Sequence, residues 1–185
     1  EQIPTVAGVG AHQRRLGDVA KVRYGSDFPK RNQGSAVGEV PFFKVIDMAL
    51  PGNEVIMVEA SNYVSKQEIS ELRYSPAPAG TVLLPRVGAA VATNKKRMLG
   101  VSALFDTSFI ALLPNEDLIP RYLLHLLANV TLLDLSNTGA ALPSVRRSAL
   151  EALVVSIPSI AEQLRVVEVL DTFDALVNDR SIGIQ

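Results

Sequence analysis

The stretch LEALVVSIPSIAEQLRVVEVLDTFDALV, residues 150–177, contains the clearest pattern in the chain and predicts a short strand followed by a long helix. LEALVVSIP indicates a strand that ends at Pro158. Ser159 is followed three residues later by Glu162, which is the capping-box arrangement of a helix start. The helix is expected over residues 160–178, a length of about 28 Å at roughly 1.5 Å per residue.

One face of this helix is apolar. Apolar residues recur at steps of three and four, the spacing at which helical side chains share a face. This apolar stripe consists of Val166, Val169, Leu170, Phe173, Leu176 and Val177. It could pack on its own domain, as most amphipathic helices do, or on another helix in an antiparallel or intermolecular coiled coil. The sequence leaves both arrangements open.

The residues before this helix predict an α+β body that is rich in β-structure. Apolar runs bounded by turn residues indicate strands over residues 40–48, 54–60, 80–88 and 107–114. KQEISELR (66–73) predicts one or two helical turns, and helical spacing over 119–136 predicts a longer helix with Pro120 in its first turn. Because strands come first and helices later, an α+β body is favoured over alternating βαβ units.

Proline and polar residues add details to the body. Pro85 has no N–H group, so its strand is expected at a sheet edge or at a bulge. TNKKRMLG (93–100) is a polar segment between two apolar runs and predicts the tip of a hairpin. Residues 1–13 mix Pro, Gly and small residues without a period, and they predict a leader or linker.

Composition limits the class of protein. The chain has 185 residues, 48% of them hydrophobic, which suits one domain with its own core or one domain with an appendage. The absence of cysteine excludes disulfides and cysteine-bound metals, and two distant histidines make a metal site unexpected. No apolar run reaches the roughly 18 residues of a membrane-spanning helix, so we expect a soluble cytoplasmic protein. A first residue of Glu suggests a mature or excised piece.

Charge is distributed unevenly along the chain. Residues 1–150 carry 16 basic and 13 acidic side chains, whereas residues 151–185 carry two basic and six acidic ones. Residues 73–105 hold five basic residues and no acid, and residues 14–31 hold six basic residues and two acids. If these two basic segments fold next to each other, they form an anion-binding face. Otherwise they are ordinary solvated charges.

No motif of a known catalytic chemistry is present. The sequence has no GxGxxG, P-loop, HExxH or GxSxG motif, and no Asn-Pro-Pro-aromatic motif of an adenine methyltransferase. His125 lies on the helix expected over 119–136, where a half-buried, hydrogen-bonded role is favoured over a catalytic one. We therefore expect no catalytic residue and no metal site, and binding is favoured over catalysis.

Short motifs, in their order along the chain, resemble the specificity subunit of type I restriction–modification systems. LGDVAKVRYG (16–25) is similar to the family's entry motif. VPFFKVIDM (40–48) and PAGTVLLPRVG (78–88) are similar to two of its strands. The segment 137–177 carries the most specific match: TGAALPSV is similar to the family's turn, and SIPSIAEQLRVVEVLD to its junction into a conserved helix.

The resemblance covers about residues 14–182, with two departures. Ser159 stands where a second proline is common, and the leader lacks the tryptophan often found before the LGD segment. Family subunits usually carry two recognition domains joined by two long helices. We therefore expect a fragment or half-subunit, with a leader at 1–13, a target recognition domain at 14–158 and the start of a spacer and dimerisation helix at 159–185.

The resemblance implies a non-catalytic chain that reads one half of a bipartite DNA target. The implied partners are double-stranded DNA, modification (methyltransferase) subunits, a restriction subunit in the full complex and a second recognition domain, in the same chain or by dimerisation. S-adenosylmethionine is expected on the modification subunit, with no cofactor in this chain. Adenine methylation and DNA cleavage are expected from these partner subunits.

Polar residues in the loops and on the matched strands are then the candidates for DNA contact. They are Lys30, Arg31, Asn32, Gln33, Lys44, Arg86, Asn94, Lys95, Lys96, Arg97, Ser144, Arg146 and Arg147. Phosphate contact is expected from Lys95, Lys96 and Arg147. Base reading is expected from Arg31, Gln33, Asn94 and Arg97 because arginine suits guanine, and asparagine and glutamine suit adenine. Each of these residues could instead be an ordinary solvated side chain.

Other functions stay open at this point. The same fold could serve as a protein–protein assembly module without its own DNA reading. It could also be the recognition domain of a type IIB or IIG system, which shares the module. An enzyme with an unrecognised site is the least favoured, since no paired titratable cluster stands out.

Overall fold

The computed structural model describes residues 11–137 and 142–182, with side chains up to residue 176. The strands are β1 (His12–Arg15), β2 (Ala20–Tyr24), β3 (Val40–Phe43), β4 (Ile56–Met57), β5 (Tyr63–Val64), β6 (Val82–Pro85), β7 (Arg97–Leu99), β8 (Leu104–Phe105), β9 (Phe109–Pro114) and β10 (Val154–Ile157). The helices are α1 (Leu16–Val19), α2 (Lys66–Leu72), α3 (Pro120–Ala128), α4 (Arg147–Ala152) and α5 (Ile160–Ile182). Short 3-10 helices are η1 (Lys30–Asn32), η2 (Val45–Ala49) and η3 (Gly88–Thr93). The expected α+β class is confirmed.

A five-stranded sheet in the order β2-β9-β6-β7-β4 forms the centre of the body. Neighbouring strands of this sheet are antiparallel, except that β4 and β7 are parallel. β6 is buried on both faces because successive side chains alternate between two apolar clusters. Val82 and Leu84 belong to the cluster that α1, α3 and α4 cover, and Leu83 belongs to the second cluster.

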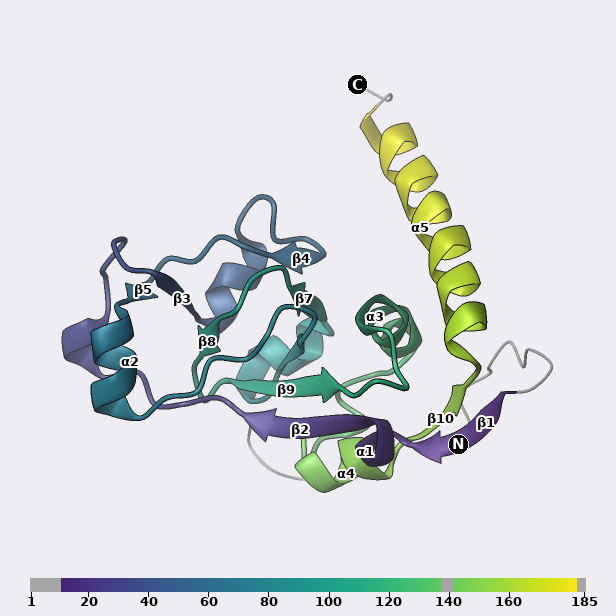
Figure 1. The fold of residues 1–185 in the computed structure, drawn as a ribbon, viewed down its shortest axis with the longest axis horizontal. Coiled ribbons are helices and arrows are strands. Elements are labelled where there is room, and N and C mark those ends of the chain that lie inside the picture. The colour runs from purple at the N-terminus through teal and green to yellow at the C-terminus, as the bar shows by residue number, and fades with distance from the viewer. Residues whose placement is uncertain (1–10, 138–141, 183–185) are drawn as a thin grey trace.

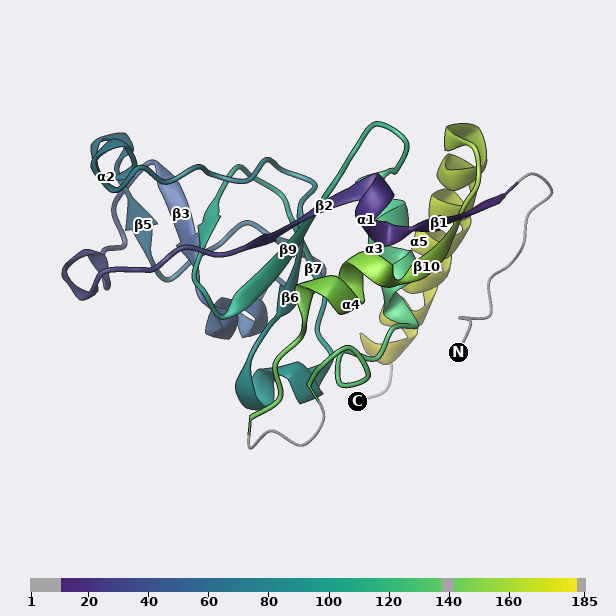
Figure 2. The same cartoon turned by 90° about the horizontal axis from the view of Figure 1, so that it is seen from below.

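The remaining elements lie at the two ends of this sheet. The small sheet β5-β3-β8 and α2 lie at one end, and α5 lies at the other, beside α3 (Figure 1, Figure 2). β1 pairs antiparallel with β10, directly before α5. His12 and Gln13, expected in the leader, therefore pair with the body.

α3 ends at Ala128, so the helix expected over 119–136 is shorter than predicted. The carbonyl of Val130 accepts a hydrogen bond from Lys96 Nζ at 2.6 Å, and the amide of Leu132 donates to Asn94 Oδ1 at 2.9 Å. These side chains replace the bonds that a longer helix would make. Val130 and Leu132 are buried, so the apolar spacing indicated burial but not helix length.

β6 lies in the middle of the sheet and keeps a regular register with β9 up to its proline, so the expected edge or bulge was wrong. Pro85 is the last residue of β6 and pairs with Phe109 of β9. The amide of Arg86 donates to the carbonyl of Ser108, so the nitrogen of the preceding proline faces the side of β7. Within β6, only Val82 and Leu83 pair with β7, so Pro85 interrupts no ladder hydrogen bond.

The segment 93–100 is not the hairpin tip that was expected. Residues 88–93 form η3 rather than a strand, and Asn94 turns the chain with φ of 54°. β7 then pairs with β6, with Met98 opposite Val82.

All five expected strands are shorter in the structure, and the reason is visible for two of them. β3 ends at Phe43, because the Asp47 carboxylate accepts the amide of Lys44 and starts η2. The strand expected over 150–158 is reduced to β10, because its first residues end α4.

Candidate nucleic-acid interface

The side chains expected to contact DNA lie in separate parts of the fold. One group gathers at the turn between β8 and β9, residues 106–108. A second, residues 94–97, lines a cavity of about 370 Å³ beside α3 and α5. Arg147 lies apart from both, on α4. The residues expected to contact DNA are therefore not all brought together.

Lys44 reaches the β8–β9 turn from the end of β3. Its ammonium donates to Gln33 Oε1 at 2.6 Å and lies 5.7 Å from the ring centre of Phe28. The carbonyl of the preceding residue, Phe43, accepts the amide of Asp106 at 3.0 Å, which holds this segment against the turn. The pKa of the Asp106 carboxyl is raised above its ordinary value, because the effect of burial exceeds the lowering effects of the hydrogen bonds from Ser108 and of the nearby Lys44.

Arg86 reaches the same turn from the end of β6. Its Nε donates to the carbonyl of Thr107 at 2.7 Å, and its guanidinium lies 5.1 Å from the ring centre of Tyr24. The ring and the carbonyl fix the plane of the guanidinium. Among the described residues no acceptor binds its Nη groups, which leaves them able to donate to a phosphate or a base. We name Gln33, Lys44, Arg86, Tyr24 and Thr107 the turn surface.

Tyr24 and Thr107 were missed in the sequence. Tyr24 ends the edge strand β2, and its ring is 44% exposed. Gly25 follows it because a Cβ there would lie 1.9 Å from the carbonyl oxygen of Asp106. The Tyr-Gly pair was a visible signal, but the contact with residues 106–107 depends on the fold.

Residues 143–146 lie alongside the turn surface. Val87 and Ser144 form an antiparallel bridge, and the amide of Val145 donates to the carbonyl of Arg86 at 2.8 Å. Arg146 follows and is exposed. The structure thus brings two candidates, Ser144 and Arg146, next to Arg86.

The loop candidates Lys30 and Arg31 are exposed on η1. Asn32, in the same turn, donates to the carboxylate of Glu68 on α2. This hydrogen bond anchors η1 to α2, so the backbone that carries Lys30 and Arg31 is held in place.

The second group is largely engaged inside the protein. Asn94 and Lys96 hold residues 130–132, and Lys96 is only 9% exposed. Burial lowers the pKa of the Lys96 ammonium to about 8. Arg97 donates to the carbonyl of Lys96, while Lys95 is partly exposed. The placement of Lys96 gives it a structural role and does not present its charge to phosphate.

Arg147 makes an ion pair within its own helix. Its Nε lies 2.7 Å from Oε1 of Glu151, one turn later on α4. Both side chains are substantially exposed, so the pair is weak and could exchange for a phosphate.

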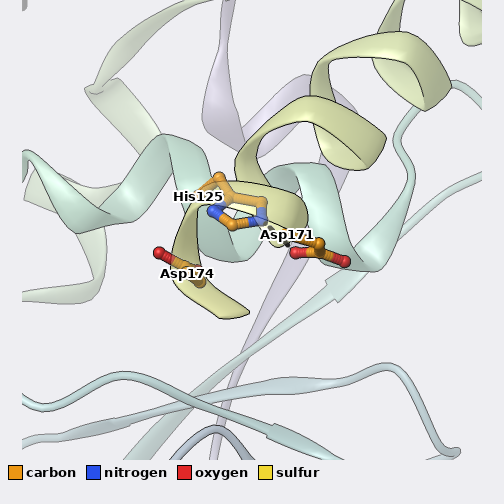
Figure 3. A group of neighbouring side chains, drawn as sticks. All are labelled: His125, Asp171 and Asp174. Atoms are coloured by element: carbon orange, nitrogen blue, oxygen red, sulfur yellow. Dashed lines mark hydrogen bonds and ion pairs between the residues drawn. The ribbon is translucent and has the colours of Figure 1, made fainter. Parts of the chain in front are cut away.

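α3 and α5 meet at a cluster of charged side chains (Figure 3). Asp171 Oδ1 lies 2.7 Å from both His125 Nε2 and Arg121 Nη2, and Asp174 lies 4.0 Å from Arg121. Burial would raise the pKa of Asp171, but hydrogen bonds from Arg121 and His125 outweigh it and hold the pKa below its ordinary value. His125 is hydrogen-bonded and partly buried, as expected.

His125, Asp171 and Asp174 offer ligand atoms within 4.8 Å of one another, the spacing of a metal site. The guanidinium of Arg121 already lies against both carboxylates. A positive charge therefore occupies the place of a cation, and the cluster is a joint between two helices. Sequence reasoning missed this joint because its members lie about 50 residues apart.

The apolar stripe of α5 is mostly open. Val166 of the stripe packs against the core, and so does Val167, which does not belong to the stripe. Val169, Phe173 and Leu176 are 54%, 60% and 55% exposed, and Leu170 is 37% exposed. The side chain of Val177 lies outside the described residues. No helix in the described part of the chain is long and apolar enough to cross a membrane.

Known proteins resemble this chain along almost its whole length. It is 23% identical over 177 residues to the specificity subunit of the type I restriction enzyme EcoR124I/EcoR124II of Escherichia coli, covering 92% of this chain and 43% of that protein. It is 26% identical over 177 residues to S.HindORF215P of Haemophilus influenzae, named as a putative type I restriction enzyme specificity subunit, covering 91% of this chain and 42% of that protein. The chain thus spans less than half the length of these relatives.

Solved structures share the fold. The HsdS subunit from Thermoanaerobacter tengcongensis matches with a TM-score of 0.71 at 19% identity, over 98% of this chain and 42% of that chain. The type I S subunit from M. genitalium matches with a TM-score of 0.63 at 14% identity, over 96% and 43%. A model of the family described as the type I restriction modification DNA specificity domain matches residues 9–184. The chain therefore belongs to the type I restriction modification DNA specificity domain family.

Proposed function

We propose that this chain is a target recognition domain that reads one half of a bipartite sequence in double-stranded DNA. The turn surface carries the proposal: Lys44 and Arg86 are held beside aromatic rings at one end of the sheet. A guanidinium held in one plane suits the paired acceptors of a phosphate or of guanine. Lys30 and Arg31 extend the positive charge, and Gln33 offers an amide for base reading. The family and the names of the relatives support the same function.

The rest of the expected complex is part of this proposal. The chain is non-catalytic, and modification subunits that bind S-adenosylmethionine methylate adenine, while a restriction subunit cleaves DNA in the full complex. The open apolar stripe of α5 supports a spacer helix that packs in a coiled coil. Its partner is a helix of a second recognition domain, in the same chain or by dimerisation, and the modification subunits dock on the pair. The complex acts in the cytoplasm.

The test is selection of duplexes from a randomised library, with the chain assembled with modification subunits from the same genome. A selected half-site of defined sequence supports the proposal. Recovery of random duplexes contradicts sequence reading. Binding to the modification subunit without any binding to DNA would favour the assembly module.

A variant pair locates the interface in the same assay. K44A/R86A should no longer select the sequence, whereas R165A, which removes an exposed arginine of α5, should still select it. An equal effect in both variants would show that the turn surface is not the reading surface.

A further inference from the structure

The contact between the recognition body and α5 begins at a buried amide. Gln163, in the first turn of α5, has none of its surface exposed. Its Oε1 accepts the amide of Ile119 at 2.8 Å, and its Nε2 donates to the carbonyls of Asp117 and Pro158 at 2.8 and 3.0 Å. One side chain thus ties α5 to the start of α3 and to the end of β10.

A second contact lies two turns further along α5. Asp171 accepts a hydrogen bond from His125 of α3 at 2.7 Å (Figure 3). It also accepts one from Arg121 of α3, at 2.7 Å. Eight residues separate Gln163 from Asp171, which is about 12 Å along the helix axis. One contact alone would let the helix swing, whereas two directional contacts at separate points define its direction.

These contacts do not use the apolar stripe. Gln163, Val167 and Asp171 share a face that lies about a third of a turn away from the centre of the stripe. Phe173, at the centre of the stripe, is 60% exposed. The helix can therefore be fixed to the body and pack on another helix at the same time.

We propose that Gln163 and Asp171 are positioning residues that fix the direction in which α5 leaves the recognition body. The consequence for DNA rests on the proposed function: two bodies on a rigid spacer reach two half-sites only at one separation. The joint thereby sets the spacing between half-sites, while the turn surface determines their sequence.

The direction of α5 can be measured on this chain alone. Because the chain has no cysteine, spin labels attach only at introduced sites, such as K66C on α2 and T172C on α5. The variants are Q163L, D171A and D171N. E168Q is the matched control, since Glu168 is an exposed carboxylate of the same helix with no side-chain contact to the body among the described residues.

The unmodified joint should give one narrow distance distribution by double electron–electron resonance. D171A and Q163L should broaden or displace it, and D171N should do so less because its amide oxygen still accepts from Arg121. E168Q should leave the distribution unchanged. Cooperative thermal unfolding followed by circular dichroism shows which variants fold. If Q163L does not fold, D171A decides the test, because Asp171 is partly exposed and its replacement should leave the body folded. A folded D171A protein with the original distribution would overturn the proposal.

The consequence for DNA is tested in the assembled complex. D171A should show about a tenfold smaller preference for the correct spacer over spacers one base pair longer or shorter, with half-site sequences still read. E168Q should keep that preference. A displaced α5 with unchanged spacer preference would overturn the link to spacing. Absence of DNA binding by the original complex would contradict the proposed function. It would not affect the positioning role of Gln163 and Asp171, which the distance measurement tests separately.

Discussion

Arg86 is a surface cation whose orientation is set before any ligand binds. The Thr107 carbonyl fixes its Nε, and the Tyr24 ring covers one side of the guanidinium. Holding the side chain in one rotamer in the free protein removes part of the entropy cost of binding. Lysine cannot reproduce this arrangement, because it has no planar group to lie on the ring.

Tyr24 is therefore expected to affect DNA binding through its ring. Y24A should weaken binding by about 0.5–1 kcal/mol, the usual size of an exposed cation–π contact, and Y24F should bind like the original chain. Fluorescence anisotropy with the selected duplex measures both. Binding by Y24F that is as weak as that of Y24A would mean that the hydroxyl, and not the ring, makes the contact.

Lys96 shows what the sequence could not predict at this scale. A run of basic residues predicts solvent exposure, but the acceptor of Lys96 is the carbonyl of Val130, 34 residues away. Only the tertiary fold brings the turn before β7 next to the segment after α3. For the same reason Asn94 was assigned to base reading, although its side chain supports Leu132.

Burial of Lys96 predicts a dependence of stability on alkaline pH. Its pKa is lowered from 10.5 to about 8 on folding, so the unfolded chain binds more protons between these values. The contribution of Lys96 to the free energy of unfolding should therefore rise from about pH 8 to pH 10.5. Urea unfolding of K96M should lack this rise, whereas K95M should retain it. An identical pH profile for K96M and the original chain would contradict a buried ammonium.

At the scale of elements, α5 has two faces with different roles. The face that carries Gln163 and Asp171 holds the body, and the stripe around Phe173 is open. The sequence predicted the stripe from its spacing. It did not predict the polar face, because glutamine and aspartate among helical charges look like an ordinary solvated surface.

F173D is expected to leave the body folded and to prevent packing of α5 on a partner helix. Phe173 is 60% exposed, so its replacement should change the free energy of unfolding by less than about 0.5 kcal/mol. V167D, on the body-facing side, should destabilise the body by more. Thermal unfolding and sedimentation with the modification subunits measure both effects. A strongly destabilised F173D would mean that the stripe packs on its own domain.

The link between α3 and α5 is expected to weaken in acid. Arg121 and His125 hold the pKa of Asp171 below its ordinary value of 3.8, so the stabilisation is present above that value and disappears as pH falls through the lower pKa of the folded state. The difference in melting temperature between the original chain and D171N should be constant near neutral pH and shrink below pH 3.8. A difference that grows in acid would contradict this assignment.

Element lengths were harder to predict than element types. The strand that became β9 and the helix that became α2 follow directly from local pattern and the Ser65 capping box. α3 is shorter than its apolar spacing suggests, because Asn94 and Lys96, in the turn before β7, bind the chain after Ala128. Pro85 was taken as a sign of a sheet edge or a bulge, although the end of a central strand tolerates a proline where the pairing with the neighbouring strand has already ended.

At the scale of the whole molecule, the acidic helix and the basic turn surface lie at different ends of the body. The acidic α5 stands at one end of the body, and the turn surface, with η1 and α2 beyond it, lies toward the other (Figure 1). The sequence predicted a strand before Pro158 and a helix after Ser159, and β10 and α5 lie there. It could not show which loops share a surface, since the meeting of Lys44 and Arg86 at one turn depends on long-range strand order.

The central claim is most directly tested by fluorescence anisotropy of this chain with duplex DNA at two salt concentrations, with and without the modification subunit. We expect binding that weakens with salt and sharpens to one sequence when the partner is added. K44A/R86A should flatten the dependence of log affinity on log salt by about 0.9 for each phosphate that is no longer neutralised, and R165A should not. Binding by K44A/R86A that equals that of the original chain at both salt concentrations would contradict the turn surface as the DNA-binding surface.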